Sequence, residues 1–249
     1  DAKTGQWWVI EPQRALSNNS VCYKEKPEIG TFMDEWISLY KSKSGERGIF
    51  NRGSAERTIA NIEGQRRELG HDWGCNPCSE ILLRDREFCN LSEIIVREDD
   101  TEESLIKKVK LATILGTWQA TLTDFRYLSK EWKKNCEEER LLGVSMTGIM
   151  DCKLTNGDKK TVNKLPELLE NLRKTAIKTN KEWSDRLGVN QSVAITCVKP
   201  SGTVSQLVDS ASGIHARHSQ YYIRTVRANT KDPLCQFMMD EGFPCEPCH

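Results

Sequence analysis

The sequence predicts an α/β protein, in which long helices alternate with the short strands of a largely parallel sheet or barrel. Apolar residues recur at helical spacing in several segments, and short runs rich in β-branched residues lie between them. Strands that alternate with long helices are typical of parallel sheets, because each crossover needs a helix-sized connection. No internal repeat or linker divides the chain, so residues 1–249 are expected to form a single domain.

The N-terminal half is expected to contain a short strand and three helices. The apolar run WWVI predicts a strand over 7–10, and apolar residues at helical spacing predict a helix over 29–43. Thr101 is a suitable N-cap for a long helix over about 102–126, because its hydroxyl can accept a hydrogen bond from a backbone N–H. A shorter helix is expected near 129–138.

The C-terminal half is expected to continue the alternation. Residues 139–150 predict a buried strand followed by a loop with glycines. An amphipathic helix is expected over 164–187, with Pro166 in its first turn and Gly188 as its stop. Two further strands are expected over SVAITCV (192–198) and YYIRTVR (221–227), and the turn KPSGTVS follows the first of them.

The charges of the chain are balanced, with 36 basic and 36 acidic residues. Proteins that bind nucleic acid or membrane surfaces carry a basic excess, so we expect neither partner. No stretch approaches the roughly 20 apolar residues needed to span a bilayer, and the first residues do not resemble a signal peptide. These features favour a cytoplasmic protein.

Ten cysteines raise the alternative of a secreted scaffold held by disulfides. Such scaffolds are small and rich in loops, whereas this chain has long helical patterns. Cys152 and Cys197 also lie in apolar runs, where a buried reduced thiol is the simplest interpretation. We therefore expect a reducing cytosol.

The segment GCNPCSEILLRDREFCNLSEI, residues 74–94, carries the side chains best suited to chemistry. Asn76, Cys78 and Glu80 occupy alternate positions, and on an extended segment such side chains project to the same face. Cys89 follows eleven residues after Cys78 in a second extended run, and a hairpin-like return would bring the two thiols together. The pattern indicates thiol chemistry, with Glu80 as acid or base and Cys89 as half of a redox pair.

Three other interpretations stay open on the residues alone. Cys75 and Cys78 have the C-x-x-C spacing that zinc sites and thioredoxin-like pairs also use. A zinc-stabilised binding module would need a second pair, which Cys245 and Cys248 supply, although the separation is far longer than in zinc ribbons, so no metal is expected. A purely structural role is the third, and it leaves the free-energy penalty of a glutamate buried beside cysteines unexplained.

The turn KPSGTVS has the features of a phosphate-binding loop. Pro200 fixes the turn, and Gly202 lets the backbone approach a ligand closely. The hydroxyl groups of Ser201, Thr203 and Ser205 stand beside a row of backbone N–H groups, and such clusters cradle phosphates. In isolation, an ordinary strand-to-helix turn with a hydroxyl cap explains the same residues more simply.

The combination N-P-C-x-E-I followed by F-C-N-L-x-E-I resembles the finger loop of ribonucleotide reductase large subunits. The resemblance runs along most of the chain, and the motifs are specific when taken together. It implies an α/β fold in the form of a partial ten-stranded α/β barrel with a central finger loop. The further matches are SNNSV (17–21), RLLGVSMTGIMD (140–151), KPSGTVSQL (199–207) and GIHARHSQYYIRTVR (213–227).

The resemblance implies a role for each residue of the site. Cys78 matches the cysteine that becomes a thiyl radical and abstracts the 3′-hydrogen of the ribose. Glu80 matches the general base on the 3′-hydroxyl, and Asn76 matches the amide that binds the ribose hydroxyls. Cys89 matches one of two cysteines that are oxidised to a disulfide while the 2′-hydroxyl leaves as water. The loop that holds the nucleotide's phosphates corresponds to Pro200, Ser201, Gly202, Thr203, Val204 and Ser205.

The separation of eleven residues between Cys78 and Cys89 resembles the adenosylcobalamin-dependent class of the family. The oxygen-dependent class has a longer insertion there, and the glycyl-radical class lacks this redox cysteine. The resemblance implies a ribonucleoside triphosphate substrate, thioredoxin or a similar dithiol as reductant, and a nucleotide effector bound outside these residues. His215 is a candidate contact for the adenosylcobalamin. A ribonucleoside diphosphate reductase large subunit is the alternative within the family.

The resemblance also predicts that the chain is an internal fragment of a longer protein. Cys22 is the sole cysteine among the first 70 residues, and its surroundings do not resemble those of the expected partner of Cys89. We therefore expect that partner, the allosteric region and the first part of the barrel to lie upstream, and the fragment alone to be inactive. Cys245 and Cys248 are interpreted as substitutions in a turn rather than as a C-terminal shuttle pair. A remnant that only interacts with other subunits is a further alternative.

Overall fold

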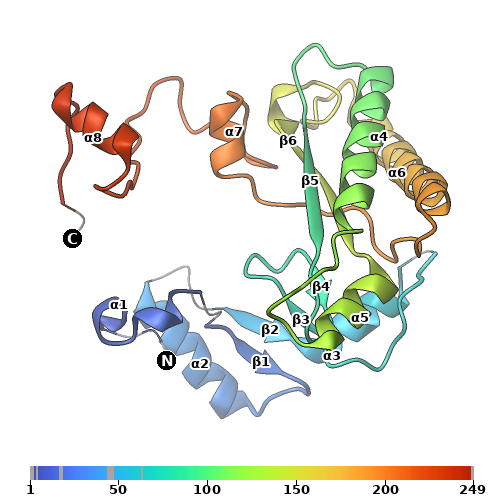
Figure 1. Cartoon of the computed structure of the whole chain (residues 1–249), viewed down its shortest axis with the longest axis horizontal. Helices are drawn as coiled ribbons and strands as arrows, with labels where there is room; N and C mark the ends of the chain where they lie inside the picture. Colours follow the sequence, from blue (N-terminus) through green and yellow to red (C-terminus); the bar gives the residue numbers. More distant parts are fainter. Residues whose placement is uncertain (1–2, 4, 17–18, 44–47, 63, 248–249) are drawn as a thin grey trace. The chain divides into compact units, whose positions relative to one another are not determined.

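The computed structural model describes residues 3, 5–16, 19–43, 48–62 and 64–247 of the chain (Figure 1). The chain forms two compact units, Asp1–Ala216 and Arg217–His249. The first unit contains all the predicted site residues, from Asn76 to His215.

The first unit begins with short helices and a small parallel sheet. Residues 7–10 form one helical turn, in which the backbone N–H groups of Val9 and Ile10 donate to the carbonyl of Gln6 at 3.0 and 3.2 Å. The predicted strand at this place is therefore wrong, because four apolar residues are too few to distinguish a strand from a helix. Strands β1 and β2 pair in parallel. The elements are α1 (Trp7–Ile10), η1 (Pro12–Leu16), β1 (Val21–Tyr23), α2 (Ile29–Ser42), β2 (Ile49–Asn51) and α3 (Arg52–Ala60).

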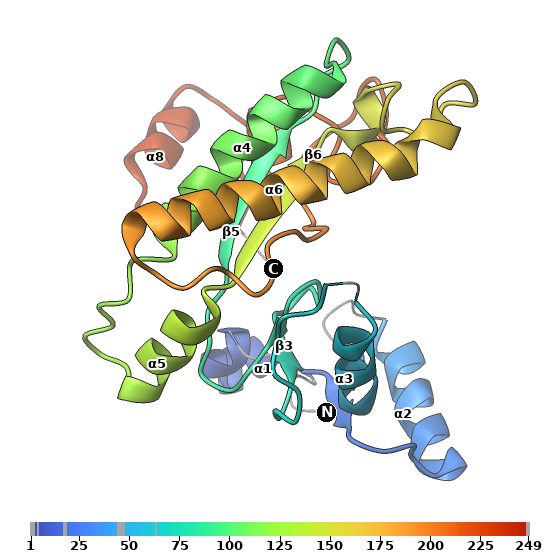
Figure 2. The same ribbon diagram turned by 90° about the vertical axis from the view of Figure 1, so that its right-hand side faces the viewer.

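A parallel β-α-β arrangement forms the centre of the first unit. β5 (Asn90–Ile95) and β6 (Leu142–Thr147) pair in parallel along their whole length. Helices α4 (Glu102–Gln119) and α5 (Lys130–Glu139) connect them, and α6 (Leu165–Leu187) follows β6. α4 packs on both strands and α6 packs on α4 (Figures 1 and 2). The prediction of an α/β protein with parallel strands is confirmed.

Apolar side chains of these strands and helices form the main core. On α4, Leu105, Val109 and Ala112 recur at spacings of four and three residues, as a helix with one buried stripe requires. Burial of a side chain such as Leu105 contributes about 1.5–3 kcal/mol. The strands and α6 add Ile94, Val96, Leu142, Val144, Leu168, Leu172 and Ala176.

Three helices have nearly the predicted bounds, whereas α4 is shorter than expected. The Thr101 hydroxyl accepts a hydrogen bond from the Ser104 backbone N–H at 3.3 Å, and the Ser104 hydroxyl accepts one from Thr101 at 3.0 Å, so the predicted cap is present. α4 nevertheless ends at Gln119 rather than near residue 126. The next carbonyl accepts a 2.6 Å hydrogen bond from the Arg140 guanidinium, a tertiary contact that the helical pattern does not reveal. α6 ends at Gly188, as predicted, with a left-handed φ of 67°.

Of the two strands predicted at 192–198 and 221–227, the first is present only as a single β-bridge and the second is absent. Within 192–198, Val144 of β6 pairs with Thr196 through a single parallel bridge, and the Cys197 backbone N–H donates to the Val144 carbonyl at 3.1 Å. This segment therefore extends the parallel pair without becoming a full strand. Residues 221–227, in the second unit, form no strand. Their apolar side chains are exposed, with Ile223 at 100%, and they pair with no strand among the described residues.

The remaining elements are short. β3 (Gly74–Cys75) and β4 (Leu82–Leu83) form a hairpin, and α8 (Pro233–Asp240) belongs to the second unit. The described residues contain three two-stranded sheets and no closed barrel. None of the described helices is both long and apolar enough to cross a membrane. The other short helices are η2 (Ile149–Asp151), η3 (Val162–Lys164) and α7 (Thr203–Leu207).

Candidate active site

The predicted finger loop is a tight hairpin rather than an extended run. β3 and β4 pair antiparallel, with Cys75 opposite Leu82. Between them, the Ser79 backbone N–H donates to the Asn76 carbonyl at 2.9 Å, and Ser79 has a left-handed φ of 62°. The expectation that alternate residues of this loop share one face of an extended segment is therefore wrong.

The turn joins the amide and the carboxylate of the loop by another route. Asn76 Nδ2 donates to Glu80 Oε1, and Asn76 Oδ1 accepts a hydrogen bond from the Ile81 backbone N–H at 3.1 Å. The Glu80 side chain is only 7% exposed. Its second oxygen, Oε2, is buried and accepts no hydrogen bond from the described residues. A buried oxygen without a donor is an acceptor available to a ligand hydroxyl.

Lys199 lies between this carboxylate and the predicted radical cysteine. Its Nζ is 2.9 Å from Glu80 Oε1 and 3.6 Å from Cys78 Sγ. Its backbone N–H donates to Ser145 Oγ of β6 at 3.0 Å, which fixes the base of the side chain to the parallel pair. In the sequence this lysine is only the first residue of the KPSGTVS motif. No signal in the sequence connects it with a loop more than a hundred residues away.

Burial and charge act in opposite directions on Glu80. Burial alone would raise the pKa of this carboxyl group, whereas hydrogen bonds from Lys199 and Asn76 and the charge of Lys199 lower it. The net pKa of Glu80 lies below its ordinary value. Burial lowers the pKa of Lys199, but the hydrogen bond and charge of Glu80 more than compensate, so that it lies above its ordinary value. The pair is therefore ionised at neutral pH.

Two further thiols lie near this ion pair. Cys89 directly precedes β5, and Cys197 follows the bridge residue Thr196. Burial raises the pKa of both thiols and the charge of Glu80 raises it further, to about 12 for Cys197. Cys89 also contributes to the raised pKa of Cys197. Both are free thiols that stay protonated at neutral pH.

Gly143 in β6 makes room for this arrangement. A Cβ atom at this position would lie 2.5 Å from Leu91 Cδ2, 3.0 Å from Cys197 Sγ and 3.3 Å from Ile81 Cδ1. The missing side chain therefore lets the Cys197 segment and the end of the finger loop pack against the same place on β6. Three segments far apart in the sequence meet here.

The predicted phosphate loop is a compact turn that leads into α7. Ser201 is buried, and its hydroxyl bonds to Glu93 Oε2 of β5 at 3.2 Å. The Ser205 hydroxyl donates inside the loop, to the carbonyls of Ser201 and Gly202 at 3.1 and 2.9 Å. Gly202 has open space where a side chain would stand. These two hydroxyls therefore shape the loop, while the exposed side is formed by Gly202, Thr203 and Val204.

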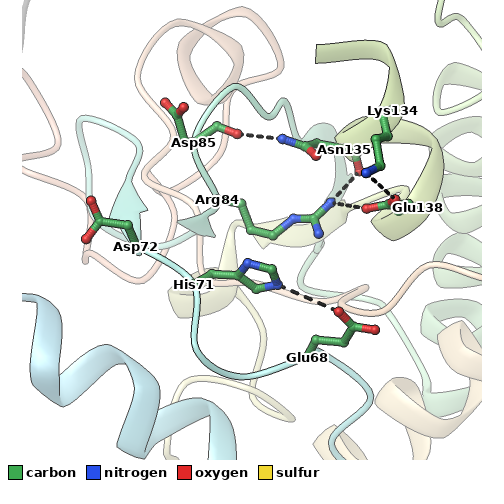
Figure 3. A pocket seen from close by; sticks show the side chains of 8 residues that line it. All are labelled: Glu68, His71, Asp72, Arg84, Asp85, Lys134, Asn135 and Glu138. Atoms are coloured by element: carbon green, nitrogen blue, oxygen red, sulfur yellow. Dashed lines mark hydrogen bonds and ion pairs between the residues drawn. The ribbon is translucent and has the colours of Figure 1, made fainter. Parts of the chain in front are cut away.

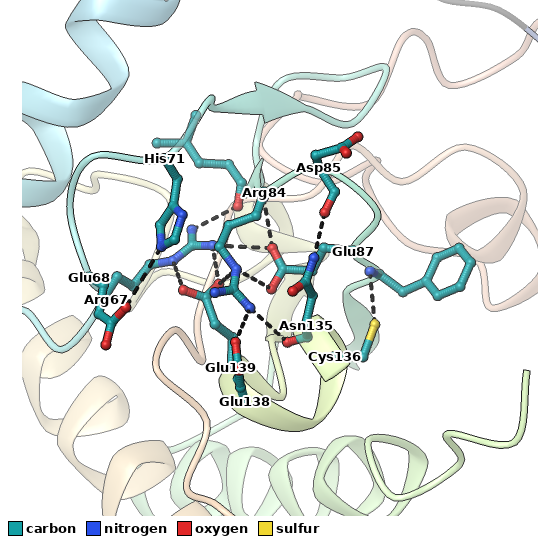
Figure 4. A network of polar contacts seen from close by, with 12 residues as sticks. Arg67, Glu68, His71, Arg84, Asp85, Glu87, Asn135, Cys136, Glu138 and Glu139 are labelled. Atoms are coloured by element: carbon teal, nitrogen blue, oxygen red, sulfur yellow. Dashed lines mark hydrogen bonds and ion pairs between the residues drawn. The ribbon is translucent and has the colours of Figure 1, made fainter. Parts of the chain in front are cut away.

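A buried cluster of charges attaches the finger loop to its surroundings (Figure 4). Arg67 donates to the Leu82 carbonyl of β4 at 2.7 Å and to Glu139 Oε1 at 3.2 Å, and its guanidinium also pairs with Glu87 at 3.4 Å. The guanidinium lies 4.5 Å from the ring centre of the fully buried Trp73. One arginine thus connects the hairpin, the approach to Cys89 and the end of α5.

The two carboxyl groups of this cluster differ in protonation. Burial raises the pKa of Glu87, and hydrogen bonding to Glu139 raises it further. Burial acts in the same direction on Glu139, but hydrogen bonds from Arg67 and Glu87 outweigh it and lower its pKa. The surroundings therefore favour the neutral acid at Glu87 and the carboxylate at Glu139.

An open pocket of about 320 Å³ lies beside this cluster (Figure 3). Arg84 donates there to Glu138 Oε2 at 3.0 Å and to the Asn135 carbonyl at 3.1 Å. The lining mixes both signs of charge and includes none of the predicted site residues. The pocket is lined by Glu68, His71, Asp72, Arg84, Asp85, Lys134, Asn135 and Glu138.

The remaining predicted residues belong partly to the first unit and partly to the second. His215 is exposed, and its backbone N–H donates to the Ser212 carbonyl at 2.8 Å. Cys245 is exposed, and Cys248 lies outside the described residues, as do Ser17 and Asn18 of the SNNSV motif. Among the residues that the structure describes, no three His, Cys, Asp or Glu side chains gather as metal ligands do.

Comparison with solved structures defines the class of fold. The chain superimposes on a B12-dependent (class II) ribonucleotide reductase with a TM-score of 0.53 and 24% sequence identity, covering 84% of this chain and 33% of that one. The fold is therefore that of part of a class II ribonucleotide reductase. No family model matches the chain.

The names of curated relatives indicate a narrower class than the fold does. These relatives are named adenosylcobalamin-dependent ribonucleoside-triphosphate reductase. Those of Lactobacillus acidophilus and Lactobacillus leichmannii are 31% and 27% identical over 258 and 262 residues, and that of Lacticaseibacillus paracasei is 29% identical over 262 residues. Each match covers 94% of this chain but only 33–34% of the relative, so the chain spans about a third of their length. The resemblance that the motifs indicated is confirmed.

Proposed function

We propose that this chain is part of the catalytic barrel of an enzyme that reduces ribonucleoside triphosphates to 2′-deoxyribonucleoside triphosphates in the cytoplasm. The observation that supports this best is the buried, donor-free Oε2 of Glu80, held beside Cys78 through Lys199. The similarity to enzymes of that name supports the substrate class. In this proposal residues 1–249 are one part of a ten-stranded barrel, which the rest of a longer protein completes.

In this proposal each side chain of the site has a separate role in the reaction. A thiyl radical at Cys78 takes the hydrogen atom from C3′ of the ribose, and Glu80 Oε2 accepts the proton of the 3′-hydroxyl. The second hydrogen of the Asn76 amide is available to a ribose hydroxyl, because its first is donated to Glu80.

Cys89 supplies a proton and an electron in this scheme. The 2′-hydroxyl leaves as water with the proton of the Cys89 thiol, whose raised pKa keeps it protonated. Cys89 and a second cysteine outside these residues together give up two electrons and form a disulfide, and their second hydrogen goes to C2′. Glu80 then returns its proton to the 3′-oxygen, and Cys78 returns its hydrogen atom to C3′. Thioredoxin or a similar dithiol then reduces that disulfide by thiol exchange.

Adenosylcobalamin, which the names of the relatives include, would supply the initiating radical when bound. Cys78 fits that chemistry because its free thiol is exposed at the turn of the hairpin, where it can exchange a hydrogen atom with a group outside the loop. We include the exposed His215 as a contact for this cofactor. The loop from Pro200 to Ser205 would hold the phosphates through its exposed backbone, and a nucleotide effector would bind outside these residues.

The test is a single substitution in the full-length protein. Cys78→Ser is expected to abolish deoxynucleotide formation, because a hydroxyl group does not form the radical that abstracts the 3′-hydrogen. Cys22→Ser is the matched control, since this exposed cysteine lies in β1, outside the site, and its loss should leave turnover intact. Turnover of the Cys78→Ser enzyme at the rate of the control would reject the proposed function.

A further inference from the structure

Lys199 has contacts that the proposed chemistry does not yet use. Its ammonium group reaches the Glu80 carboxylate at 2.9 Å and the Cys78 sulfur at 3.6 Å, and both partners belong to the finger loop. Its backbone is held by Ser145 at 3.0 Å. A single side chain thus connects the reactive hairpin with β6 and with the start of the phosphate loop.

The surroundings leave Glu80 dependent on this cation. Its side chain is 7% exposed, whereas that of Lys199 is 26% exposed and therefore partly hydrated. The thiols of Cys89 and Cys197, which also face Glu80, are neutral. Among the described residues, Lys199 is the cation in contact with Glu80. Without it, burial would favour the neutral carboxylic acid.

We propose that Lys199 is a positioning residue, which keeps Glu80 ionised and holds its free oxygen and the Cys78 sulfur at a fixed separation around the substrate ribose. The inference rests on the proposed function, since it assigns Glu80 the role of base. Lys199 bonds to Oε1 and leaves Oε2 for the substrate hydroxyl. It does not itself exchange protons with the substrate.

The first test is the pH profile of the full-length enzyme. Lys199→Met removes the cation, so the pKa of Glu80 should rise and the acid limb of kcat/KM should move by about one pH unit or more to higher pH, the size of effect of an adjacent opposite charge. At a pH on the acid limb, kcat/KM should fall about tenfold for each pH unit of that shift. Lys199→Arg keeps the charge and should keep the acid limb in place. An unmoved limb in Lys199→Met would overturn the proposal.

A second readout does not need turnover. The infrared carboxylate band that disappears in Glu80→Gln reports the ionisation of Glu80 directly. Its titration midpoint should rise in Lys199→Met and stay near that of the parent enzyme in Lys199→Arg. If the midpoint shifts but the parent makes no deoxynucleotide, the proposed function fails and the pairing of Lys199 with Glu80 stands. If the parent enzyme is active but the midpoint does not shift in Lys199→Met, the proposed function stands and the positioning role of Lys199 fails.

Lys199→Gln is a second neutral variant, which controls for a folding defect in Lys199→Met. It keeps hydrogen-bond donors and loses the charge, so its acid limb and infrared midpoint should follow those of Lys199→Met. Circular dichroism establishes that each variant is folded before it is titrated. Loss of the native fold in both neutral variants would contradict a positioning role and indicate a structural one instead.

Discussion

The three thiols around Glu80 differ in their environment, and their chemistry should differ accordingly. Cys78 is exposed at the turn of the hairpin, whereas Cys89 and Cys197 are partly buried. Burial and the nearby carboxylate raise the pKa of both inner thiols, to about 12 for Cys197. Since the thiolate is the nucleophile, the inner thiols are protected from modification and available as proton donors.

These environments predict the order of alkylation by iodoacetamide. At pH 8 in the full-length protein without substrate, Cys197 should remain almost unlabelled, because about one thiol in ten thousand is ionised four pH units below its pKa. The exposed Cys22 serves as the internal reference. Mass spectrometry of the peptides measures the order, and labelling of Cys197 as fast as that of Cys22 would contradict the burial described here.

At the scale of elements, the finger loop is held by a cluster of charges rather than by its own two-residue strands. Arg67 bonds to the β4 backbone and to Glu139 at the end of α5, and it pairs with Glu87 two residues before Cys89. Buried ion pairs of this kind add little net stability over apolar packing, but removing one partner leaves a buried charge uncompensated. The cluster therefore fixes the hairpin relative to Cys89.

Neutralising each carboxyl group in turn should separate the two glutamates. Glu139→Gln removes the anion that pairs with Arg67 and should lower the free energy of unfolding by about 3–5 kcal/mol. Glu87→Gln replaces a group that is already protonated and keeps its donor and acceptor, so about 1 kcal/mol or less is expected. Denaturant unfolding of the full-length protein measures both. Equal losses, or a larger one for Glu87→Gln, would contradict the neutral form of Glu87 and the ionised form of Glu139.

The helices and strands also show which element bounds can be predicted from sequence patterns alone. α2, α5 and α6 could be predicted to within one residue because amphipathic spacing and stop signals such as Gly188 act locally. α4 ends earlier than its pattern predicts, and the carbonyl after its end accepts a hydrogen bond from Arg140, a tertiary contact that the pattern does not contain. The strand expected over 221–227 was wrong because alternation is a property of the segment alone, whereas a strand needs a neighbour.

For the whole molecule, the candidate site is assembled from the finger loop, the residues before β5 and the segment that follows the Thr196 bridge. Motifs identified the first two segments and assigned the third to phosphate binding. The ion pair of Lys199 with Glu80 and the position of the Cys197 thiol against Gly143 could not be predicted, because the packing of these segments on β6 places them. The chain spans about a third of its curated relatives (34% of the Lactobacillus acidophilus protein). We propose that the partner of Cys89 lies outside residues 1–249.

The central claim is that Cys78 and Cys89 serve one reaction in different roles, as radical and as reductant. A single turnover of the pre-reduced full-length enzyme, with adenosylcobalamin and a ribonucleoside triphosphate but no external dithiol, tests it most directly. Mass spectrometry should find Cys89 in a new disulfide with a cysteine outside residues 1–249, in proportion to the deoxynucleotide formed, and Cys78 still a free thiol. Deoxynucleotide formed while Cys89 stays reduced, or a disulfide that contains Cys78 instead, would contradict the account.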